Sequence, residues 1–344
     1  MKGIELDNQD IVIAKTGVFF CFGYQGGIEM IKYQRRKKMD RRTDRTMKEI
    51  HQFLREHATE DMSMDEINDL LSTHMQEINA AITKEKTEET AETADDFMDL
   101  AEEKLEAGDE LGGLRLARKA LKLEPDNLDV SWFIIRTEEK DPEVLLRKIR
   151  MILETGKASL EKQGFFDADC IGDFWQILET RPYIRLKSQY VFSLIEAGKL
   201  KMAVQEAEDI ICLNQDDNMG VRFRLMHLYA GLEDAESAEK MLNKYSEHDE
   251  CPILMALILL YYKLDKTDQA EKYLRRLLKI NKDTRTFVRD ILAGRQEHIL
   301  SEINQRGGYV PYTEEELVMT YVENESIYES VPLFFRWITK ALKM

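Results

Sequence analysis

The sequence predicts an all-α protein, a helical-hairpin array (α-solenoid) with a small helical module before it and a helical cap after it. Apolar residues recur at the spacing of amphipathic helices, and short turns separate successive runs. Residues 181–217 show this plan most clearly. Leu186, Tyr190 and Leu194 lie one helical turn apart. A second apolar run follows the break at Gly198, and two helices joined by so short a turn must lie antiparallel.

The composition agrees with this fold class. Hydrophobic residues make up 43% of the 344 residues and charged residues 33%, which provides a core beneath a strongly charged surface. Only 6 Pro and 17 Gly occur, which argues against a β protein rich in turns. The net charge of −16 disfavours a broad nucleic-acid-binding surface.

The cysteines and the N-terminal region indicate a cytoplasmic protein. The four cysteines form no C-x-x-C pair, so we expect free thiols in a reducing compartment. The most apolar early run, GVFFCFGY, is far shorter than the ~20 residues that span a bilayer. Acidic residues precede this run, unlike the basic start of a signal peptide. We therefore expect no membrane association.

Residues 1–38 are expected to form an irregular extension, because two short β-like runs have no further strand to pair with. Codons for the residues before Met30 and Met39 can form a purine-rich ribosome-binding sequence. The sequence therefore leaves Met1, Met30 and Met39 open as the true start, with the preceding residues rarely made. The basic segment 32–45 could bind an anionic partner such as nucleic acid. A solvated extension is the preferred interpretation, since the only aromatic residue there is Tyr33.

Residues 39–83 are predicted to form the small helical module, with a helix over Met47–Arg55 and a second helix after a capping box at Ser63 and Glu66. Residues 84–93 are acidic and poor in apolar side chains, so we expect a linker that does not order itself.

Residues 94–300 carry the repeated pattern. The stretch ARKALKLEPDN resembles the second helix and exit turn of a tetratricopeptide repeat. Aligned on Pro125, Gly113 and Ala120 fall on its two small-residue positions, where helices must approach closely. Three further hairpins have alanine at the first small position: Ala203, Ala238 and Ala270. The exit proline is missing after Asn214 and Lys279.

A narrower resemblance involves three stretches: Phe174-Trp175, then Glu179-Thr180-Arg181-Pro182-Tyr183, then Asp217-Asn218-Met219-Gly220-Val221-Arg222. They look like signatures of bacterial repeat proteins related to the suppression-of-tumorigenicity-seven family. The resemblance implies a helical-repeat fold and adds little about mechanism.

Residues 301–344 are predicted to form a C-terminal helical tail. Its last part, Pro332–Leu342, is rich in aromatic residues. We favour a helix folded back onto the final repeat. The cap that an array needs on its last face is expected before this tail, in a helix over Phe287–Leu300. A partner anchor is the alternative.

No motif points to catalysis. The six histidines show no H-x-x-x-H or H-E-x-x-H spacing, and neither a phosphate-binding loop nor a nucleophile elbow occurs. The paired carboxylates are typical of solvated helix faces in so acidic a chain. We therefore predict no catalytic residue, no metal ion and no cofactor.

What remains is a binding surface on the concave face, lined by the first helix of each hairpin. Its predicted partner-binding residues are Arg185, Gln189, Phe223, Arg224, His227 and Tyr262. A cationic pair beside an apolar floor would suit a peptide segment with some acidic character. The alternative is that the apolar members simply pack between helices. We predict a non-enzymatic scaffold or adaptor for another protein or peptide. A nucleic-acid-associated regulator using residues 32–45, or an enzyme with an unrecognised site, remains as an alternative.

Overall fold

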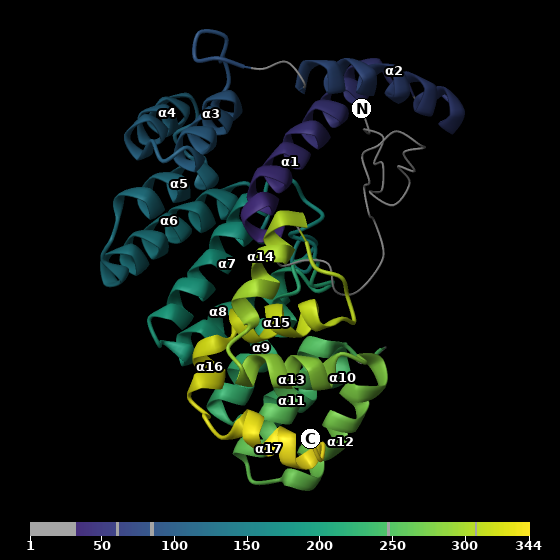
Figure 1. Ribbon diagram of the computed structural model, residues 1–344. Coiled ribbons are helices and arrows are strands. Elements are labelled where there is room, and N and C mark those ends of the chain that lie inside the picture. Colours follow the sequence, from purple (N-terminus) through teal and green to yellow (C-terminus); the bar gives the residue numbers. More distant parts are fainter. Residues whose placement is uncertain (1–31, 60–61, 83–85, 246–247, 307) are drawn as a thin grey trace. The chain divides into compact units, whose positions relative to one another are not determined.

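The computed structural model describes residues 32–59, 62–82, 86–245, 248–306 and 308–344 (Figure 1). Within these ranges the fold is all-α, as predicted, with seventeen helices and no strand. The β-like runs and Met30 lie outside the described residues. Met39 lies inside the first helix. No described helix combines the length and the apolar character that crossing a bilayer requires.

The described residues divide into two compact units. Unit 1 holds residues 37–140 and 176–182, and unit 2 holds residues 32–36, 141–175 and 183–344. The helices that lie in unit 1, wholly or for the most part, are α1 (Lys32–His57), α2 (Met64–Ile82), α3 (Ala94–Glu106), α4 (Glu110–Leu123) and α5 (Leu128–Glu138).

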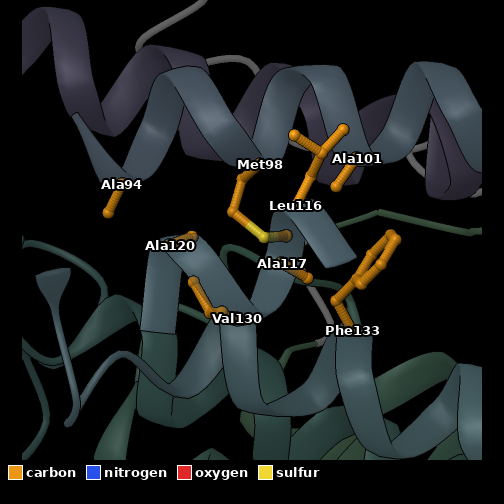
Figure 2. Close-up of a cluster of buried hydrophobic side chains, with 8 residues drawn as sticks. All are labelled: Ala94, Met98, Ala101, Leu116, Ala117, Ala120, Val130 and Phe133. Atoms are coloured by element: carbon orange, nitrogen blue, oxygen red, sulfur yellow. The ribbon is translucent and has the colours of Figure 1, made fainter. Parts of the chain in front are cut away.

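The first core of unit 1 lies between α3, α4 and α5. Its buried side chains are Ala94, Met98, Ala101, Leu116, Ala117, Ala120, Val130 and Phe133 (Figure 2). The helices approach closely because small residues lie where they meet. A Cβ atom at Gly113 would lie only 2.9 Å from the carbonyl oxygen of Ala101. Gly113 and Ala120, predicted as small-residue positions, are both buried.

The second core of unit 1 lies between α1 and α2. Its buried side chains are Met47, Ile50 and Leu54 of α1, Ile67, Leu71 and Met75 of α2, and Leu178. The predicted capping box is present, since the amide of Ser63 donates to Glu66 at 2.8 Å and the amide of Glu66 donates to the hydroxyl of Ser63 at 3.3 Å. The helix that was expected from Met47 begins fifteen residues earlier, at Lys32.

The acidic segment before α3 makes specific contacts, where the sequence suggested an unordered linker. Residues 83–85 lie outside the described residues, but the ammonium group of Lys86 pairs with Asp96. Glu88 pairs with Arg115 and with Lys119 of α4. Charge pairing therefore holds this segment against α3 and α4 although it buries few apolar groups.

Unit 2 is built from the remaining helices. They are α6 (Pro142–Lys162), α7 (Arg181–Glu196), α8 (Leu200–Leu213), α9 (Val221–Leu232), α10 (Ala235–Lys244), α11 (Cys251–Lys263), α12 (Thr267–Ile280), α13 (Thr284–Leu292), α14 (Gln296–Arg306), α15 (Glu314–Glu323), α16 (Glu325–Glu329) and α17 (Phe334–Ala341). The first turn of α7, Arg181 and Pro182, belongs to unit 1.

The middle helices of unit 2 pack on their neighbours in chain order. Helix α9 contacts α8, α10 and α11, and α11 contacts α12. The three alanines predicted at helix crossings, Ala203, Ala238 and Ala270, have no exposed surface. Their burial is what the hairpin pattern requires, because a larger side chain there would push the helices apart.

The C-terminal segment folds back onto earlier helices of unit 2. Helix α15 packs against α11, α13 and α14, α16 packs against α9, and α17 packs against α13. Phe334 and Ile338, the buried side chains of α17, leave only 2% and 4% of their surface exposed. The aromatic tail therefore forms a helix that packs against earlier helices of unit 2.

Candidate functional site

The start of α9 is fixed by Asp217, which adopts a left-handed backbone conformation with φ of 48°. Its carboxylate accepts hydrogen bonds from the amides of Val221 at 2.6 Å and Arg222 at 3.0 Å. The Arg222 guanidinium also donates to Asp217 at 2.9 Å and to Glu250 at 2.7 Å. The stretch from Asp217 to Arg222 thus caps α9 and joins it to the residue before α11.

Two of the six predicted partner-binding residues lie on α7. Arg185 and Gln189 are 8% and 9% exposed. Next to them, Lys187 is 6% exposed and pairs with Glu206 and Asp209 of α8. This part of α7 presents little polar surface to solvent.

Arg224 of α9 faces the end of α15. Its Nη1 donates to the carbonyl oxygen of Glu323 at 3.3 Å, and its Nη2 lies 3.9 Å from the Glu323 carboxylate. The guanidinium carbon also lies 3.6 Å from the ring centre of Phe192, a cation–π distance. A positive group therefore meets the negative C-terminal end of a helix, a favourable arrangement.

His227 of α9 is completely buried and faces α16. Its Nδ1 lies 2.8 Å from the carbonyl oxygen of Phe223 and must donate to it. Its Nε2 lies 3.0 Å from the hydroxyl oxygen of Tyr328 and therefore accepts. Burial, with Arg224 nearby, lowers the pKa of His227 to about 4, so the ring is neutral at neutral pH.

Tyr262 of α11 meets the aromatic residues of α17. Its ring centre lies 5.4 Å from that of Phe334 and 5.1 Å from that of Trp337. These spacings are typical of favourable aromatic pairs. Arg224, His227 and Tyr262 thus all contact the chain's own C-terminal segment. The sequence did not connect that segment with these residues.

A pocket lies between the start of α9 and α15, and we call it the α9–α15 pocket. Its lining residues are Met219, Gly220, Phe223, Arg224, His227, Pro252, Tyr309, Met319, Thr320, Glu323 and Asn324. Three predicted residues, Phe223, Arg224 and His227, belong to it. The sequence missed the wall from α15, because nothing in residues 309–324 shows that they lie beside α9.

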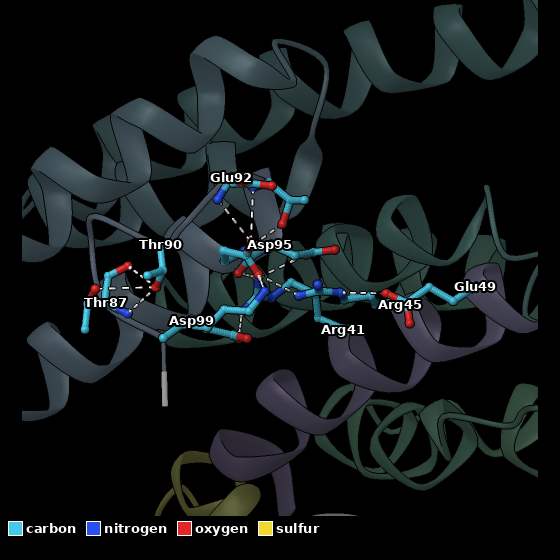
Figure 3. A network of polar contacts seen from close by, with 11 residues as sticks. Arg41, Arg45, Glu49, Thr87, Thr90, Glu92, Asp95 and Asp99 are labelled. Carbon is cyan, nitrogen blue, oxygen red and sulfur yellow. Dashed lines mark hydrogen bonds and ion pairs between the residues drawn. The ribbon is translucent and has the colours of Figure 1, made fainter. Parts of the chain in front are cut away.

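The basic segment 32–45 makes contacts within unit 1 through two of its arginines (Figure 3). Arg41 pairs with Asp95 at 3.1 Å and with Asp99 at 2.6 Å, and it is only 7% exposed. Arg45 pairs with Asp96 at 3.0 Å. These two positive groups are matched by carboxylates of α3. The side chains of residues 32–40 and 42 lie outside the described residues.

Within the part of the chain that the structure describes, no three His, Cys, Asp or Glu side chains are placed to hold a metal ion. The α9–α15 pocket combines an apolar floor with one positive and one negative group, Arg224 and Glu323.

The chain was compared with protein-family models and with curated proteins. No family model and no curated protein matches it.

Proposed function

We propose that this protein is a non-enzymatic interaction scaffold or adaptor that binds a segment of another protein at the α9–α15 pocket. The observation that carries the proposal is the pocket itself. Three of the six predicted partner-binding residues, Phe223, Arg224 and His227, line it, whereas Arg185, Gln189 and Tyr262 do not.

The chemistry of the pocket suits a protruding apolar side chain. Met219, Phe223, Pro252 and Met319 supply apolar walls. Methionine side chains adapt their shape to different partners, which favours recognition of a segment over recognition of one small molecule. Arg224 and Glu323 at the same site place opposite charges that can orient a peptide backbone.

The architecture that we propose around this site is tetratricopeptide-like. Its support is the burial of Ala203, Ala238 and Ala270 at equivalent positions in three second helices, α8, α10 and α12. A cytoplasmic location and a bacterial origin are part of the same proposal, resting on the free cysteines and the resemblance of the motif stretches.

The proposal can be tested with a displayed library of random peptides selected against the full chain. We expect Met319→Ala to weaken binding of the selected peptides by about tenfold, because it removes a pocket wall. Met202→Ala is the matched control, since Met202 is 40% exposed on α8 and lies outside the pocket lining. Equal binding to the wild type and the Met319→Ala variant would show that the pocket is not the site.

A further inference from the structure

The surface formed by α9 and α11 makes three contacts of different chemistry with one stretch of chain, residues 323–338. Arg224 meets the carbonyl oxygen and the carboxylate of Glu323. His227 accepts the hydroxyl of Tyr328. These two side chains lie one helical turn apart on α9, so they recognise their targets from the same face.

The third contact is aromatic. Tyr262 packs against Phe334 and Trp337, whose ring centres lie 5.4 Å and 5.1 Å from the ring centre of Tyr262. Between the two polar contacts, Ile327 packs over the backbone of Gly231, and a Cβ atom added to Gly231 would lie 3.5 Å from the Ile327 side chain. The surface therefore distinguishes an acidic helix end, a tyrosine hydroxyl and an aromatic pair along one segment.

Few polar contacts hold the last two helices in place. Besides the bond between His227 and Tyr328, the guanidinium of Arg285 donates to the carbonyl oxygen of Leu342 at 2.8 Å. The remaining contacts are apolar, with Tyr328 and Phe334 3% and 2% exposed. A segment held by side-chain packing can be replaced by another that offers the same side chains in the same order.

We infer that residues 323–338 are an internal ligand of this surface. The partner is then a segment of another protein that presents the same side chains as Glu323, Tyr328, Phe334 and Trp337 from short helices joined by turns, as the end of α15, α16 and α17 do here. That partner binds by displacing the chain's own segment, which is thus autoinhibitory. This inference goes beyond the proposed function, because displacement of the segment removes Glu323 from the wall of the α9–α15 pocket and exposes the surface of α9 and α11 instead.

The test uses the full chain with a protease site inserted after Gly308, where a Cβ atom would meet nothing within 4 Å. After cleavage, a fluorescein-labelled synthetic peptide of residues 309–344 is added in excess, and its uptake is followed by fluorescence anisotropy. We expect the labelled peptide to exchange into the cleaved protein. Circular dichroism before and after cleavage shows whether the helices persist.

Peptide variants test the pattern. Tyr328→Ala and Trp337→Ala are expected to weaken uptake by about tenfold each, whereas Leu333→Ala, at a position that is 59% exposed, changes little. Tyr262→Ala in the protein is expected to have the same effect as Trp337→Ala in the peptide.

The inference fails if the labelled peptide does not exchange, or if Leu333→Ala weakens uptake as much as Tyr328→Ala. These outcomes are separate from the test of the proposed function. Library peptides that need Met319, together with no exchange of residues 309–344, would keep the scaffold and remove the internal ligand. Exchange of the 309–344 peptide, together with no library peptide that binds the chain, would keep the internal ligand and remove the proposed binding at the pocket.

Discussion

The Nε2 atom of His227 lies 3.0 Å from the hydroxyl oxygen of Tyr328, and this bond joins α9 to α16. Because the other ring nitrogen donates to the carbonyl oxygen of Phe223, Nε2 can only accept while the ring is neutral. Protonation would place a second donor against the Tyr328 hydroxyl and a positive charge in a buried site next to Arg224. The contact is therefore sensitive to pH.

We expect His227 to contribute a loss of stability to unit 2 in mild acid, opposite in sign to Asp217 and Glu314, whose raised pKa values favour the folded state there. The pKa of His227 is lowered from the ordinary 6.5 to about 4 by burial. Between these values the unfolded chain binds a proton that the folded chain does not, so the free energy of unfolding falls as the pH falls from 6.5 towards 4. The His227 contribution from about pH 7 to about pH 5 is a loss of roughly 2 kcal/mol, measurable by urea unfolding as the difference between the wild type and a variant without this histidine.

The control for this pH effect is a pair of variants. His227→Gln removes the titrating group and should flatten the dependence between these pH values, even though the variant is less stable throughout. His248→Gln, at an exposed position, should leave the dependence intact. An unchanged slope in His227→Gln would show that other groups control the acid response.

Ala203→Leu should destabilise the protein by overpacking a helix crossing. Ala203 has no exposed surface, so the added atoms must displace neighbouring helices at a cost of roughly 1–3 kcal/mol. Gln205→Leu introduces the same side chain at an exposed position of the same helix and should have a much smaller effect. Equal changes in the midpoint of thermal unfolding would contradict the assigned register of α8.

Arg41→Gln should loosen the contact between α1 and α3. Removing the guanidinium leaves Asp95, Asp99 and Glu102 close together without their shared positive partner. Breaking so buried a pair costs roughly 3–5 kcal/mol. Hydrogen exchange should rise in α1 and α3 first. The same substitution at the exposed Arg275 is the control, and comparable exchange in both variants would count against the network.

Asp217→Ala should be more damaging than Asp217→Asn. Alanine removes the acceptor of the Val221 and Arg222 amides and is strained at a φ of 48°. We expect a loss of roughly 1–3 kcal/mol from the unsatisfied buried amides. Asparagine tolerates this backbone conformation and keeps one acceptor oxygen. If both variants unfold at the same urea concentration, the charge pair with Arg222 matters more than the turn.

The helices themselves follow from local sequence. The capping box at Ser63 and Glu66 and the apolar stripe of α8 depend on residues within a few positions of one another. Periodicity therefore predicts such elements well. Periodicity did not predict that α1 begins at Lys32, because Lys32 to Asp40 carries no apolar stripe and resembles a solvated tail. Periodicity also did not predict the contacts of the segment from Lys86 to Thr93. These contacts depend on ion pairs of Glu88 with Arg115 and Lys119, which lie in α4.

The sequence by itself determined the all-α class and the burial of Ala203, Ala238 and Ala270. It also predicted one partner-binding surface, made of Arg185, Gln189, Phe223, Arg224, His227 and Tyr262. These features repeat at fixed short spacings, so one chain shows them. Tertiary structure alone decided what faces that surface. In the sequence, Glu323 and Tyr328 lie about a hundred residues from Arg224 and His227, and Trp337 lies somewhat nearer to Tyr262. No spacing rule links residues so far apart. Packing and charge complementarity in the folded chain bring them together.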